Sequence, residues 1–211
     1  TAAAPAPGPN EEEDDEEAED EHHEGFFARF TLALGWAFAG GEGTLPPAKG
    51  LRALEDADHN SPAFGFALDL GGGFHDIALH LGVLYERMIV RAREPERIGF
   101  SLFGLGGGLT WYFTDSDFYA TAQARLVGLM LYFPDVICDS FFRDRYEWLR
   151  GPGFSITLGK EWFEDDEGEG GEKDDSGIGL GLQGTYAPLT ARSGAKIHYG
   201  SVMLVLTFSG F

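Results

Sequence analysis

The sequence has little cysteine, few basic residues and no long apolar run. Cys138 is the one cysteine among 211 residues, which excludes an internal disulfide and a metal site built from several thiolates. No run of about 18 apolar residues occurs, which excludes a transmembrane helix but not a barrel, whose strands are short and alternate in polarity. Lys and Arg number 15 against 35 Asp and Glu. The resulting net charge of −20 argues against nucleic acid as a partner.

The negative charge is concentrated in two segments. Residues 11–24 hold 11 acids and no Lys or Arg, and residues 164–175 hold 8 acids and one Lys, so the rest of the chain is nearly neutral. Residues 1–25, which are Ala/Pro-rich and then acidic, are predicted to form a disordered tail, followed by one β-barrel domain over 26–211. EF-hand spacing is absent, so solvated polyanions are expected, with no metal and no cofactor. A basic protein partner is a candidate for either segment.

From Phe26 onward the chain alternates large apolar residues with small or polar ones, a period typical of strands. Glycine (31 residues) and phenylalanine (18) are both abundant, as expected for curved strands with one bulky face. In the fourth strand the alternation of large and small residues is unclear at Gly104–Gly108, which favours a β-bulge there. The eight predicted strands cover residues 26–40, 64–71, 77–86, 98–113, 118–133, 154–161, 178–185 and 201–208.

The connections alternate in length. Residues 71–75 and 114–117 read as tight turns, whereas 41–61, 88–97, 134–152 and 187–196 read as longer loops. Short turns at one end and longer loops at the other describe an outer-membrane barrel with its turns in the periplasm. The link at 164–176 is too long for such a turn. It therefore leaves open both the orientation of the barrel in the membrane and the pairing of the two strands that the link connects.

Alternation alone fits a soluble barrel as well as a membrane barrel, and three features favour the membrane. The apolar face of residues 26–40 is long enough to cross a bilayer. The opposite face is rich in Gly and Ala, which fit a narrow lumen. Aromatic residues gather at both strand ends, as in membrane girdles. They are Phe26, Phe27, Trp111–Phe113, Phe118, Tyr119, Trp162, Phe163 and Phe208–Phe211 at the turn end, and Trp36, Phe38, Tyr85, Tyr132, Phe133, Tyr186 and Tyr199 at the loop end.

On this architecture the chain resembles the small outer-membrane barrels of the OmpA transmembrane-domain, OmpX and OmpW type. The last strand, VMLVLTFSGF, is similar to their terminal assembly signal, although Leu204, Leu206 and Phe208 are out of step with Phe211. The resemblance implies an all-β, eight-stranded antiparallel up-and-down transmembrane β-barrel. It also implies location in a Gram-negative outer membrane, with outer-membrane lipid around the barrel and the N-terminus in the periplasm.

Polar residues on the small face are predicted to form a network that plugs the lumen, because buried charges must be paired or hydrated. A structural or interaction role follows. A narrow or gated pore, a carrier or passage for a small apolar ligand, and a soluble periplasmic or secreted binding barrel are the alternatives. The predicted lumen network is Arg29, Asp69, His80, Glu86, Gln123, Arg125, Glu161 and Gln183.

The sequence points to no catalysis. His59 with Ser61, and His198 with Ser201, lie close along the chain but in no distinctive context for a nucleophile and its base. The loop 134–152 holds aromatic residues beside arginines, a combination typical of contact surfaces. The aromatic residues of this loop are Phe141, Phe142, Tyr146 and Trp148. They are expected either to bind a protein partner or to cap the mouth of the barrel.

Overall fold

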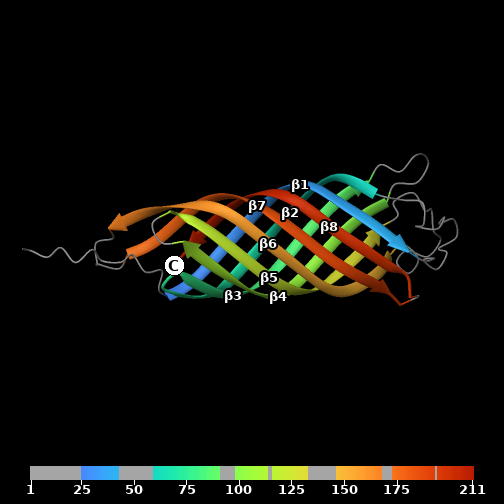
Figure 1. Ribbon diagram of the computed structural model, residues 1–211, viewed down its shortest axis with the longest axis horizontal. Coiled ribbons are helices and arrows are strands. Elements are labelled where there is room, and N and C mark those ends of the chain that lie inside the picture. The colour runs from blue at the N-terminus through green and yellow to red at the C-terminus, as the bar shows by residue number, and fades with distance from the viewer. Residues whose placement is uncertain are drawn as a thin grey trace, which may run out of the picture.

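The structure, a computed structural model, is a closed β-barrel. It describes residues 25–42, 59–90, 98–113, 116–132, 146–167, 173–192 and 194–211. Each of eight strands pairs antiparallel with the next along the chain, and the last pairs with the first (Figure 1). The predicted eight-stranded antiparallel up-and-down β-barrel is therefore confirmed. In the described part of the chain no helix is long and apolar enough to cross a membrane.

The strands are longer than the alternation alone predicts, because the contrast between the two faces fades toward the strand ends. They are β1 (Gly25–Glu42), β2 (His59–Phe74), β3 (Ile77–Val90), β4 (Ile98–Phe113), β5 (Phe118–Tyr132), β6 (Tyr146–Glu167), β7 (Lys173–Ala191) and β8 (Lys196–Gly210).

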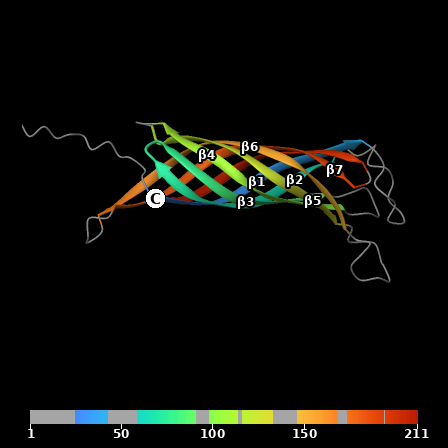
Figure 2. The same ribbon diagram turned by 90° about the horizontal axis from the view of Figure 1, so that it is seen from below.

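The two ends of the barrel differ in their connections. At the turn end, residues 75–76 join β2 to β3 and 114–117 join β4 to β5; at the loop end, 43–58, 91–97 and 133–145 connect the strands. The C-terminus lies at the turn end (Figures 1 and 2). Residues 1–24, which make up nearly all of the predicted tail, and Cys138 are outside the described residues.

Two predicted connections are wrong because strand pairing continues through them. The long link at 164–176 is mostly strand: β6 and β7 remain paired from Glu164 with Ser176 to Glu167 with Lys173. This hairpin extends beyond the other strands at the turn end (Figure 1). At the other end, the predicted loop 187–196 is a tight connection, because β7 runs to Ala191 and β8 begins at Lys196.

The predicted loop 134–152 also ends earlier than expected. Tyr146 begins β6, and Trp148 is an exposed side chain on the outer face of that strand rather than part of a loop. Phe141 and Phe142 lie outside the described residues. The predicted bulge at Gly104–Gly108 is absent, since β4 pairs with β3 and with β5 in one unbroken register.

Burial divides each strand into two faces. Alternate residues are exposed on the outside, where most of the large apolar side chains lie, such as Leu81 at 70 % and Leu126 at 78 % of their accessible surface. The intervening residues point into the lumen and are buried. The small interior of an eight-stranded barrel is just wide enough for these side chains to fill.

The predicted aromatic belts are only partly correct, because adjacent aromatic residues in a strand face opposite sides. Phe26, Trp111, Phe118 and Trp162 are exposed on the outside, but some of their predicted companions point into the lumen. The side chains of Tyr132 and Phe133 are outside the described residues. The members of the predicted belts that face inward are Phe27, Tyr112, Tyr119, Phe163, Tyr199 and Phe211.

Candidate functional site

The lumen is the candidate site, because it gathers the buried polar residues of the chain. The structure places all eight residues of the predicted lumen network on the inner face, and each is buried. Hydrogen bonds and ion pairs divide them among three groups that follow one another from the turn end toward the loop end. The first two groups meet where Oγ1 of Thr110 lies 3.3 Å from Nε2 of His80.

The first group is centred on Arg29 of β1 and Glu161 of β6. Their charged atoms, Nη2 and Oε2, lie 2.9 Å apart, and the two side chains are 3 % and 0 % exposed. Arg29 also donates hydrogen bonds to the hydroxyl groups of Tyr112, Thr110 and other residues around the lumen. Both charges are therefore paired and surrounded by hydrogen-bonding groups, as buried charges require. The remaining hydroxyl partners of the pair are Thr121, Thr207 and Ser209.

The second group joins Asp69, His80, Gln123 and Arg125. The Oδ1 atom of Asp69 accepts a hydrogen bond of 3.0 Å from the Gln123 amide and lies 3.4 Å from Nδ1 of His80. Arg125 approaches the same carboxylate oxygen at 3.7 Å and donates hydrogen bonds to the side chains of Gln123 and Ser155. The group thus links β2, β3, β5 and β6 across the lumen.

The third group surrounds Glu86 of β3, whose side chain is 0 % exposed. Its carboxylate accepts hydrogen bonds from Tyr199 (2.9 Å), Ser201 (3.0 Å), Thr185 (3.0 Å) and the Gln183 amide (3.3 Å). Among the described residues no Lys, Arg or His forms an ion pair with it. Four neutral donors satisfy this acid in place of a counter-charge.

Glycines on the inner face of β4 create the space for the second group. A Cβ atom added to Gly106 would lie 2.5 Å from Cα of Arg125, and one added to Gly108 would lie 2.5 Å from Cγ of Gln123. Any larger residue there would force the network apart. Gly106 and Gly108 of the run that suggested a bulge are therefore explained by the close approach of β5, through its backbone at Gly106 and through the Gln123 side chain at Gly108.

Sequence reasoning missed the apolar filling of the lumen at the loop end. Toward that end, the inward positions change from polar to large apolar residues, which pack into a buried cluster. The signal was present in the sequence, because these residues occupy the same alternate positions as the polar network. They are Leu84, Met88, Phe100, Leu102, Val127, Leu129, Leu149, Leu189, Ile197 and Met203.

The turn end of the lumen is lined by aromatic rings. The ring of Phe211 lies 5.2 Å from Phe27, 5.6 Å from Tyr112 and 6.0 Å from Phe163, measured between centroids. This explains why Phe211 is out of step with Phe208: its ring belongs with the inward-facing residues, whereas Phe208 is exposed outside.

His198 and Ser201 do not assemble a catalytic site, because they lie on opposite faces of β8. His198 is exposed and hydrogen-bonded to Tyr186, whereas Ser201 points inward and donates to Glu86. Ser61 is buried near the start of β2, and the side chain of His59 is not described. Within the described ranges no group of three His, Cys, Asp or Glu residues could hold a metal ion.

Comparison of the sequence with protein-family models and with characterised proteins finds no match. Solved structures do match. Ail, the attachment invasion locus protein of Yersinia pestis, solved with the heparin analogue sucrose octasulfate, is 9 % identical over 87 % of this chain and 98 % of its own, with a TM-score of 0.50. Neisserial surface protein A is 14 % identical over 86 % of this chain and 95 % of its own, with a TM-score of 0.49. The chain therefore has the fold of the small eight-stranded outer-membrane β-barrels, as its sequence resemblance predicts.

Proposed function

We propose that this protein is an integral outer-membrane β-barrel with a structural or interaction role and a closed lumen. The observation that carries the proposal is the contrast between the two faces of the wall: apolar side chains are exposed outside, and charged groups are buried inside. In water, each exposed Leu or Phe would forgo roughly 1.5–3 kcal/mol of burial free energy. A bilayer core removes that cost. A polar interior behind an apolar outer surface is also the arrangement found in outer-membrane barrels.

The arrangement of the ends supports an orientation. Short turns and the C-terminus lie at one end, and three of the four connections at the other end are longer. In barrels of this kind the short turns face the periplasm. We therefore assign the N-terminus, the acidic tail and the acidic β6–β7 hairpin to the periplasm, where a basic protein is their candidate partner.

The packing of the lumen supports closure. Glu161 at the turn end, Glu86 in the middle and Leu129 at the loop end are each 0 % exposed, so no water molecule fits beside them. A continuous path would require these groups to move apart, which opposes the alternatives of a pore and of an apolar passage through the lumen. The buried Ser155, Ser201 and Ser209 are hydrogen-bonded within the polar groups of the lumen, which supports a role without catalysis.

Membrane insertion and lumen closure have separate tests. The full chain should require detergent for extraction, and its folded and boiled forms should migrate differently on gels. A monodisperse monomer without detergent would contradict the membrane assignment. In planar bilayers the inserted protein should give no large steady conductance, and such a conductance would contradict closure while leaving the membrane assignment intact.

A further inference from the structure

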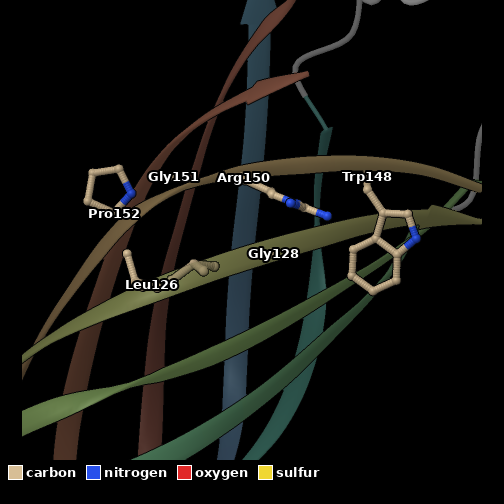
Figure 3. Close-up of a pocket in the computed structure, with 7 residues that line it drawn as sticks. Leu126, Gly128, Trp148, Arg150, Gly151 and Pro152 are labelled. Carbon is tan, nitrogen blue, oxygen red and sulfur yellow. The ribbon is translucent and has the colours of Figure 1, made fainter. Parts of the chain in front are cut away.

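A groove lies on the outer face of the barrel, between β5 and β6 near the loop end. Its volume is about 670 Å³. Figure 3 shows Arg150 between Pro152 and Trp148 along β6, with its side chain extending toward Trp148. The lining is mainly apolar, and Arg150 is its charged residue. The lining residues are Leu126, Val127, Gly128, Trp148, Arg150, Gly151 and Pro152.

The groove exists because Gly128 interrupts a row of aromatic side chains. Outside the barrel, Tyr85 contacts Phe66 and Phe103, with ring centroids 5.2 and 5.0 Å apart. The next residue in the same row is Gly128, which pairs with Phe103 on one side and with Arg150 on the other. The Trp148 ring leans across this position, 3.4 Å from where a Cβ of Gly128 would lie, and contacts Phe103 at 6.2 Å.

The other wall of the groove lies where the β6–β7 pairing is interrupted. Residue pairs are formed at Arg150 with Thr190 and again at Phe154 with Tyr186, but not between them. Pro152 and Pro188 lie in this gap, and neither has an amide hydrogen to donate. The groove is therefore built into the strands, and it does not depend on the connecting loops.

Arg150 is an exposed charge on an otherwise apolar surface. It forms no hydrogen bond or ion pair with any side chain that the structure describes. Cationic residues on the lipid-facing side of a barrel are unfavourable at depth, unless they reach the interface and find an anion. The planar guanidinium of arginine binds phosphate through two parallel hydrogen bonds.

We propose that this groove binds the phosphorylated headgroup of a lipid in the leaflet at the loop end. Arg150 binds the phosphate, and an acyl chain lies against Leu126 and Pro152 in the space that Gly128 leaves open. In an outer membrane, the lipid of that leaflet is a glycolipid of the lipid A class, which carries phosphate on its sugars. This inference rests on the proposed membrane function, because the groove faces lipid only if the barrel spans the membrane.

The test measures lipid A retention by the full chain in mild detergent, using native mass spectrometry. Arg150→Gln removes the charge, and Gly128→Leu fills the groove without changing the charge. We expect each to weaken binding of diphosphorylated lipid A about tenfold. Arg87→Gln is the matched control, because Arg87 is also an exposed cation on the outer face, but outside the groove. It should bind as the unmodified chain does.

Equal weakening by Arg87→Gln would indicate general attraction of anions and would overturn the proposal. Equal binding of lipid A stripped of its phosphates would overturn it too. Inorganic phosphate alone should not bind measurably; binding that depends on Arg150 would assign the site to free phosphate instead of lipid. All variants should keep the gel shift on heating. A chain that fails to insert into bilayers at all contradicts the proposed function, and this site with it.

Discussion

The guanidinium of Arg29 on β1 lies 2.9 Å from the carboxylate of Glu161 on β6, across the interior of the barrel. The two strands are not neighbours in the sheet, so this ion pair joins opposite parts of the wall. Its surrounding hydroxyl groups come from β4, β5 and β8. The pair therefore ties together strands from opposite sides of the barrel wall.

Removing one partner of this pair should be strongly destabilising. Glu161→Ala leaves the Arg29 charge buried without its counter-ion, and we expect the free energy of unfolding to fall by about 3–5 kcal/mol. Urea unfolding of the protein in lipid vesicles measures the change. The matched control is Asp117→Asn, which removes the charge from the exposed pair of Asp117 with Lys160 at 3.2 Å and keeps a residue that tolerates the left-handed backbone there (φ 51°). Exposed pairs contribute about 1 kcal/mol or less. Similar losses in the two variants would contradict this account of the lumen.

The hydrogen bonds to Glu86 give a second prediction. Tyr199→Phe deletes one hydroxyl donor from this buried carboxylate, and unfolding should become easier by about 1–3 kcal/mol. Tyr186→Phe removes a hydroxyl of the same kind from the exposed hydrogen bond with His198 and should cost less than about 0.5 kcal/mol. The same unfolding assay compares the two. If both tyrosine variants behaved alike, the third polar group would not stabilise the barrel.

The tail gives a third prediction. Residues 1–24 hold 11 acids and no large apolar residue, so ordering them would cost roughly 1–2 kcal/mol per residue with no burial to offset it. A chain that starts at Gly25 should therefore unfold within about 0.5 kcal/mol of the full chain. Thermal melting in detergent is the measurement. A large loss on truncation would make the tail part of the fold.

Alternation along the strands was sufficient to predict the closed barrel, because one period of two residues fixes which side chains share a face. The same period placed Arg29, Asp69 and Glu86 on one face, and the abundance of Gly and Ala on that face was one of the features that predicted it to line the lumen. Strand ends were predicted poorly, since the pairing of β6 with β7 continues through Gly-rich and acidic residues that read as a link. Phe211 faces inward because it continues the alternate positions of β8 that point into the lumen, such as Thr207 and Ser209. From the sequence it was compared instead with Phe208, which lies on the outer face.

The partners within the lumen were beyond prediction from the sequence. Whether Arg29 meets Glu161 or Asp69 depends on strand tilt and register across the barrel, which no local pattern encodes. The groove at Arg150 was missed for a similar reason. Gly128 and Arg150 are far apart in sequence, and they become neighbours only through the register of β5 with β6.

The central claim is that the exposed apolar face contacts lipid, and substitutions on that face test it most directly. Leu81 is 70 % exposed and lies midway between Ile77 and Tyr85 along the outer face of β3. Leu81→Arg should lower the free energy of unfolding in lipid vesicles by about 2–4 kcal/mol, because the charge would lie near the bilayer centre. Asn60→Arg, at an exposed position near the loop-end start of β2, should cost about 0–1 kcal/mol. A Leu81→Arg variant that is as stable as the unmodified chain, and more soluble without detergent, would show that this face meets water and would contradict the account.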